Sequence, residues 1–96
     1  MSQAQLILLV EDNPDDVESA RRSFRRSGVS NPLFHCEDGD DALDYLYQRG
    51  EFRDATRPGI ILLDLNLPGT SGKEVLTEVK SDPDLCAIPV IVLTTS

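Results

Sequence analysis

The sequence predicts an α/β fold built on a parallel, doubly wound sheet. Short unbroken apolar runs, typical of strands that are buried on both faces, alternate along the chain with amphipathic helical patterns. Polar side chains follow most of these runs directly. With 96 residues, of which 40% are hydrophobic and 27% charged, the chain has the composition of one small globular domain. A two-domain enzyme is excluded.

The first strand is expected at residues 6–10, and a well-marked helix start follows it. Asn13 is a suitable N-cap, and Pro14 suits the first helical position ahead of two acidic residues in the first turn. Gly28 is expected to end this helix. The buried stripe predicted from the helical spacing consists of Val17, Ala20 and Phe24.

The next strand and helix are expected at residues 33–36 and 41–48. Gly50 is expected to end the helix, and residues 51–59, of which four are charged, to form a surface loop. The acidic residues between the strand and the helix are interpreted as turn and capping residues; they are Asp38, Asp40 and Asp41.

A third strand at residues 60–63 repeats the pattern of the first, with Asp64 directly after it. A loop at 65–71 then leads to a helix at 72–80, which the pair Asp82 and Pro83 should end. A fourth apolar strand is expected at residues 88–93.

The complete order of elements is βαβαβαβ. Such alternation predicts a parallel sheet with helices on both faces and right-handed crossovers. In open sheets of this kind the functional site lies at the carboxyl ends of the strands, where the strand order reverses. Three predicted strands have polar side chains at that end: Glu11 and Asp12 after the first, Asp64 after the third and Thr94 after the fourth.

The acidic members of this set indicate a cation site. If the first and third strands are neighbours, the carboxylates of Glu11, Asp12 and Asp64 converge. Three like charges at close range repel one another, so the cluster favours a bound cation, and ligands that are all oxygen suit Mg²⁺. For each acid taken alone, a helix cap or a solvated loop residue is the alternative interpretation.

The charge balance disfavours several classes of partner. Nine Lys and Arg against 17 Asp and Glu give a net charge of -8, which opposes nonspecific binding to nucleic acid or to anionic membranes. Because the sequence has neither a signal peptide nor an apolar run long enough to span a membrane, we expect a cytoplasmic location. Cys36 and Cys86 have no metal-binding spacing and are expected to be free thiols.

The basic residues and the single histidine allow two interpretations each. Four arginines at helical spacing, Arg21, Arg22, Arg25 and Arg26, form either a solvated face favoured by the helix dipole or a docking surface for an acidic patch on a partner protein. His35 has no partner histidine or serine, which favours a packed or surface imidazole over a catalytic one. The sequence contains no Walker loop, nucleophile elbow or zinc pattern.

Three segments resemble the motifs of the receiver domain of two-component response regulators. They are residues 9–13 (Leu-Val-Glu-Asp-Asn), 62–72 (Leu-Leu-Asp-Leu-Asn-Leu-Pro-Gly-Thr-Ser-Gly) and 89–94 (Pro-Val-Ile-Val-Leu-Thr). The resemblance covers the whole chain in order and implies a flavodoxin-like fold. Within the family, the chain is most similar to single-domain regulators paired with phytochrome-type kinases, in its Pro-Asp-Asp helix opening, the loop 49–58 and the Leu-Thr-Thr-Ser ending.

The resemblance implies a role for each matched residue. Asp64 matches the phosphoacceptor, which takes a phosphoryl group from a sensor histidine kinase, and Thr94 matches the hydroxyl that moves in the conformational switch. Asp12, Asp64 and the backbone carbonyl of Asn66 match the direct Mg²⁺ ligands, while Glu11 matches an acid that acts through metal-bound water. The protein would not be an enzyme, beyond self-catalysed phosphotransfer and autodephosphorylation.

The resemblance also implies that residues 1–96 form an incomplete receiver domain. A complete one continues with a helix, a strand and a helix, and includes a lysine that completes the phosphate site. The fourth strand would then be an exposed edge, open to self-association. Two other functions stay open: a phosphatase of the haloacid-dehalogenase type, which needs an acid where Asn66 stands, and a receiver-like module that binds partners without phosphorylation.

Overall fold

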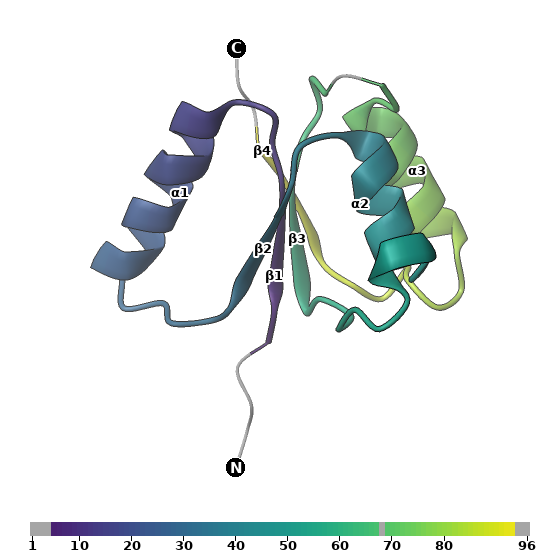
Figure 1. Ribbon diagram of the computed structural model, residues 1–96, viewed down its shortest axis with the longest axis horizontal. Helices are drawn as coiled ribbons and strands as arrows, with labels where there is room; N and C mark the ends of the chain where they lie inside the picture. The colour runs from purple at the N-terminus through teal and green to yellow at the C-terminus, as the bar shows by residue number, and fades with distance from the viewer. Residues whose placement is uncertain (1–4, 68, 94–96) are drawn as a thin grey trace.

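The computed structural model describes residues 5–67 and 69–93. The strands are β1 (Ile7–Val10), β2 (Leu33–Cys36), β3 (Ile60–Asp64) and β4 (Val90–Leu93), and the helices are α1 (Pro14–Arg26), α2 (Gly39–Leu46) and α3 (Gly72–Ser81), with a 3₁₀ helix η1 (Gly50–Phe52). The strands form one parallel sheet in the order β2-β1-β3-β4. Helix α1 covers one face, and α2 and α3 cover the other (Figure 1). The predicted doubly wound α/β class is confirmed. No helix in the described ranges is long and apolar enough to cross a membrane.

The central strand β1 explains why its apolar run is unbroken. All its residues are buried, and alternate side chains enter two different cores. Leu8 and Val10 pack in the core beneath α2 and α3, whereas Ile7 and Leu9 pack beneath α1. A strand between two helical layers has no solvated face, so every position is apolar.

Helix α1 has the start and the buried stripe that the sequence predicts. The Asn13 side chain accepts a hydrogen bond from the backbone N–H of Asp15 at 2.9 Å. Val17 is buried, and Ala20 and Phe24 pack against the same core. The predicted end of the helix is close to the observed one, since Gly28, with φ +76°, lies two residues beyond Arg26, the last residue of α1.

Helix α2 begins and ends two residues earlier than the predicted range 41–48. Asp38 is the N-cap, and its side chain accepts from the backbone N–H of Asp41 at 2.8 Å. Gly50 does not end this helix; it begins η1, whose other two residues lie in the segment predicted as a surface loop. The 3₁₀ turn places Phe52 against Phe34 and Tyr45, and this aromatic contact gives the charged segment a packed anchor.

The last two strands differ from prediction by their end residues. Asp64 is the final residue of β3 and does not follow it. β4 begins at Val90, two residues later than expected, because Pro89 has no N–H for the ladder and offers only its carbonyl, which accepts from Ile61 N at 2.9 Å. Between β3 and β4, α3 starts with a Ser71–Glu74 capping box and ends at Ser81, before Asp82 as predicted.

Candidate metal centre

Three carboxylates meet at the carboxyl ends of β1 and β3. Glu11 and Asp12 follow β1, and Asp64 ends β3. The two strands are neighbours in parallel register, with Val10 paired to Leu63, so the predicted convergence is confirmed. One oxygen from each carboxylate lies within 4.8 Å of the other two.

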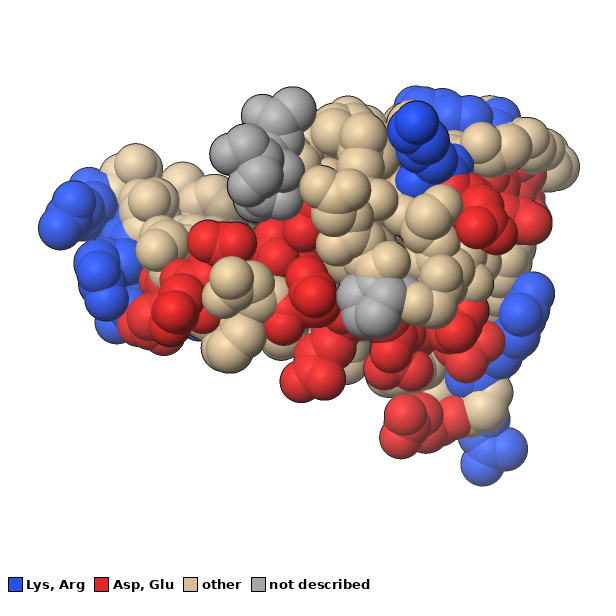
Figure 2. All heavy atoms as spheres, turned by 90° about the horizontal axis from the view of Figure 1, so that it is seen from above, with Lys and Arg blue, Asp and Glu red and all other residues tan. Residues whose placement is uncertain are grey.

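The cluster is buried on one side and open on the other. Glu11 and Asp64 are each only 2% exposed, whereas Asp12 is exposed. Seen from the carboxyl ends of the strands, acidic side chains gather across the middle of the molecule, with Lys and Arg at its margins (Figure 2). The site therefore offers anionic oxygens to solvent at Asp12, in a strongly negative field.

Glu11 is the electrostatically strained member of the cluster. Its Oε1 accepts from the backbone N–H of Asn13 at 3.1 Å, but its Oε2 is buried without a hydrogen-bond partner among the described residues. Burial raises the pKa of Glu11 to about 7, and the charge of Asp64 adds to the rise. A buried carboxylate oxygen that lacks a donor would be stabilised by a cation.

These residues fit a small divalent cation. The donors are all carboxylate oxygens, which hard cations such as Mg²⁺ prefer, and the exposed side at Asp12 leaves space for water ligands and for an anionic group. Asn66, the fourth residue implied as a ligand, is exposed two residues beyond Asp64.

The loop after β3 folds back over Asp64. The backbone N–H of Asn66 donates to Asp64 Oδ1 at 3.0 Å, which orients that carboxylate. At the far end of the loop, Gly72 lies so close that a Cβ there would overlap the carbonyl oxygen of Asp64. The glycine lets α3 start directly against the end of β3 and makes the loop short and closed.

A second contact, which was not predicted from the sequence, holds this loop from the side. The hydroxyl of Thr70 donates to the carboxylate of Asp40, in the first turn of α2. A Cβ at Gly39 would overlap the carbonyl oxygen of Thr70, so only glycine permits this approach. We call these residues, Gly39, Asp40 and Thr70, the α2 latch.

His35 also contacts the site, through the backbone. Its Nε2–H donates to the carbonyl oxygen of Glu11 at 2.6 Å. The imidazole is half-buried, in agreement with the packed interpretation, but its role as a support for Glu11 was not predicted. The pairing of Val10 with Cys36, which brings the end of β2 alongside the end of β1, explains the contact.

Thr94 lies outside the described residues. The last described residue of β4 is Leu93, which is paired in register with Asp64. The four arginines of α1 are all exposed, and none belongs to the acid cluster.

A comparison with known proteins finds a protein family that matches this chain. The family model for the response regulator receiver domain matches residues 7–96. Among curated proteins, response regulator Rcp1 from Synechocystis sp. is 47% identical over 92 residues, an alignment that covers 96% of this chain and 63% of that protein. The chain therefore spans less than two thirds of this relative's length.

Solved structures agree in both fold and sequence. The crystal structure of the phosphorylated cyanobacterial phytochrome response regulator RcpA superimposes with a TM-score of 0.92 and 48% identity, over 98% of this chain and 67% of that one. The Mn²⁺-bound form of response regulator Rcp1 gives a TM-score of 0.91 and 47% identity, over 96% of this chain and 66% of that one.

Proposed function

Because the chain belongs to the response regulator receiver domain family of two-component systems, we propose that its Asp64 accepts the signalling phosphoryl group. The observation that carries this proposal is the geometry of Asp64, a buried carboxylate that meets two further acids at the open end of the sheet. A phosphoryl group arriving there brings more negative charge, so the same residues must also hold a cation.

Asp64 then has two tasks, as the phosphoacceptor and as one of the residues of the metal site. Glu11, Asp12 and Asp64, with the backbone carbonyl of Asn66, would hold Mg²⁺, and the ion would neutralise the acid cluster and the phosphoryl oxygens. The support for this set is the all-oxygen donors and the Mn²⁺-bound form of the relative Rcp1, together with Glu11 Oε2, which has no hydrogen-bond partner within residues 5–67 and 69–93. The N–H of Asn66 orients the Asp64 carboxylate for attack.

The transfer itself is a displacement at phosphorus. A carboxylate oxygen of Asp64 forms the new O–P bond while the P–N bond of the phosphohistidine breaks, and the histidine of the donor leaves as a neutral imidazole once it takes a proton. The chain supplies position and charge compensation, with no covalent chemistry beyond the acyl phosphate. Hydrolysis of that acyl phosphate, assisted by the same site, completes the cycle.

Thr94 is proposed as the hydroxyl that responds to phosphorylation. It follows Leu93, and Leu93 is paired with Asp64 across the β3–β4 ladder. The support is therefore the family match together with this register, which sets the residue directly before Thr94 in the sequence beside Asp64.

The proposed phosphodonor is a sensor histidine kinase of the phytochrome type. Support comes from the relatives, among which RcpA is a phytochrome response regulator and RtBRR, 45% identical, is a bacteriophytochrome response regulator. The family match favours this function over the haloacid-dehalogenase alternative.

Intact mass spectrometry after incubation with phosphoramidate and Mg²⁺ tests the proposal. We expect one phosphoryl adduct on the wild-type chain, none on Asp64→Asn, and an unchanged adduct on the matched control Asp54→Asn, an exposed acid outside the cluster. Chelation of the metal should abolish labelling. An adduct that persists in Asp64→Asn contradicts the assignment. If the wild-type chain forms no adduct and binds a partner equally well with and without Mg²⁺, the protein is a phosphorylation-independent binding module instead.

Transfer from a kinase tests the partner separately. A phytochrome-type histidine kinase and an unrelated histidine kinase are each autophosphorylated with labelled ATP and mixed with the chain. Faster transfer from the phytochrome-type kinase is expected, and equal or slower transfer would contradict the partner while leaving the phosphoacceptor intact.

A further inference from the structure

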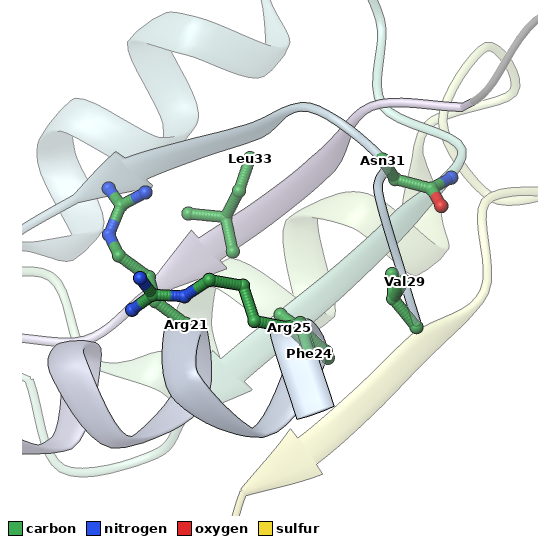
Figure 3. A pocket seen from close by; sticks show the side chains of 6 residues that line it. All are labelled: Arg21, Phe24, Arg25, Val29, Asn31 and Leu33. Carbon is green, nitrogen blue, oxygen red and sulfur yellow. The ribbon is translucent and has the colours of Figure 1, made fainter. Parts of the chain in front are cut away.

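A pocket of about 320 Å³ lies between helix α1, the segment that follows it and the start of β2 (Figure 3). We call it the arginine pocket; its lining residues are Arg21, Phe24, Arg25, Val29, Asn31 and Leu33. Leu33 is the first residue of β2, whereas the acid cluster lies at the carboxyl ends of β1 and β3. In a parallel sheet these are opposite ends, so the arginine pocket is separate from the candidate metal centre.

The pocket combines an apolar wall with two cationic groups. Phe24, Val29 and Leu33 are half-buried and supply the apolar surface. Arg21 and Arg25 are exposed and lie four residues apart, which places both guanidinium groups on the same side of α1. Arginines beside a partly buried aromatic ring are typical of the residues that contribute most to protein interfaces.

The helix dipole does not explain both arginines. Arg25 lies in the last turn of α1, where a cation is favoured by the dipole. Arg21 lies before that turn, where the effect of the dipole has largely faded. The one ion pair that the described residues of α1 make joins Arg25 to Glu18 at 3.6 Å, with both side chains more than half exposed, and such pairs are weak. Both guanidinium groups can therefore exchange water for an external carboxylate.

We propose that the arginine pocket docks an acidic segment of a partner protein, with one apolar side chain against Phe24 and Leu33 and flanking carboxylates on Arg21 and Arg25. Charge complementarity selects this occupant. The net charge of -8 disfavours extended polyanions such as nucleic acid and anionic membranes, which would also face the acidic parts of the surface, whereas a short acidic peptide can contact Arg21 and Arg25 alone. The apolar wall favours a peptide with a hydrophobic residue over a purely ionic ligand. This proposal does not depend on the role of Asp64.

Fluorescence polarisation with a labelled peptide, Asp-Glu-Glu-Leu-Glu-Asp, tests the pocket directly. We expect the double variant R21E/R25E to lose at least about tenfold in affinity. The matched control is R22E/R26E, on the same helix with the same change of charge but outside the lining, and it should lose no more than about twofold. Both variants change exposed residues, and their melting temperatures verify that they are folded.

Two further measurements distinguish binding in the arginine pocket from general attraction to the positive charge of α1. Replacing the peptide's Leu by Ser should weaken binding to the wild-type chain severalfold, because the apolar contact is lost. Phosphoramidate labelling of Asp64 should proceed equally in R21E/R25E and wild type. No binding of the peptide to the wild-type chain, equal losses in the two double variants, or indifference to the Leu-to-Ser change would each overturn the proposal.

Discussion

The carboxyl groups of Glu11 and Asp64 lie within 4.8 Å of each other at the ends of neighbouring strands, and each residue is only 2% exposed. Two ionised carboxylates at this distance, without water around them, repel one another. The folded chain thus holds an unfavourable pair at its site, which either a proton on Glu11 or a bound cation relieves.

In the absence of metal, stability should fall as the pH rises from about 5 to about 7. The pKa of Glu11 is raised to about 7 in the folded chain, mainly by burial, whereas the unfolded chain has the ordinary lower value. Between these two values the unfolded state releases its proton first, so raising the pH favours unfolding, and the effect ends above about pH 7. We expect a loss of about 1–3 kcal/mol, measured by urea unfolding across this range. Glu11→Gln should lack this loss; an equal loss in that variant would assign it to another group.

Mg²⁺ should raise the melting temperature of the wild-type chain near neutral pH. A ligand that binds only the folded state stabilises it by about 3 kcal/mol at a hundred times its dissociation constant. Asp12→Asn removes one exposed carboxylate of the cluster and should reduce the shift strongly. Asp15→Asn, an exposed acid in the first turn of α1 outside the cluster, should leave it unchanged. Equal shifts in the three proteins at matched ionic strength would mean that Mg²⁺ acts on the general surface charge.

The α2 latch should hold the loop that follows Asp64. Thr70→Val removes the donor to Asp40 and is expected to cost about 1 kcal/mol, while Thr70→Ser keeps the hydroxyl and should cost less. Gly39→Ala should cost more than either, since its Cβ would overlap the carbonyl oxygen of Thr70. Hydrogen exchange of residues 65–71, compared with that of α3, measures the effect. Uniform acceleration across α3 and the loop would indicate global destabilisation instead of a released latch.

The acid cluster could be predicted from the sequence because its members sit at strand ends, and parallel strands bring such ends together whatever the details of the loops. The α2 latch could not be predicted in this way. Asp40 and Thr70 are 30 residues apart, and their contact depends on how closely α2 and the loop approach, which a buried glycine at 39 permits. The start of α2 was misplaced for a local reason, since neighbouring acids all suit a cap and the hydrogen bond from Asp41 N selects Asp38.

The arginine pocket shows the same limit of prediction. The spacing of Arg21 and Arg25 on one helix face is readable from the sequence, as is the apolar position of Phe24. Their combination with Leu33 depends on how α1 lies against the start of β2, and this is a property of the packed core. Helical spacing therefore predicts which side chains share a face, while tertiary packing decides whether that face borders a cavity.

The two cysteines should differ greatly in reactivity. Both are free thiols, as predicted, but Cys36 is buried and Cys86 is exposed. Burial raises the pKa of Cys36 to about 12, so the reactive thiolate is scarce as well as inaccessible. With a chromogenic disulfide reagent at neutral pH, Cys86 should react rapidly and release one equivalent of the reagent's thiol per chain. Cys36 should react at least about a hundredfold more slowly. Cys86→Ser should lose the fast phase; a fast phase retained in that variant would mean that the end of β2 opens readily.

The last prediction concerns the edge strand β4. Within residues 5–67 and 69–93, β4 pairs with β3 only, and its Ile91 is 49% exposed, while its neighbours are partly buried. An apolar strand with an open ladder is a template for pairing with a second chain. We therefore propose that the 96-residue chain self-associates through β4.

Ile91→Lys tests this edge without emptying the core, because the side chain already points partly to solvent. A lysine on an edge strand opposes pairing through its charge and its hydration, so sedimentation velocity should show a dissociation constant at least about tenfold weaker than for wild type. Thr77→Lys adds the same charge on the exposed face of α3 and should leave association unchanged. A wild-type chain that remains monomeric at high concentration, or equal weakening in both variants, would exclude β4 as the contact. Since Ile91 is paired in register with Leu62, two residues before Asp64, association through this strand would bring a second chain close to the proposed phosphoacceptor.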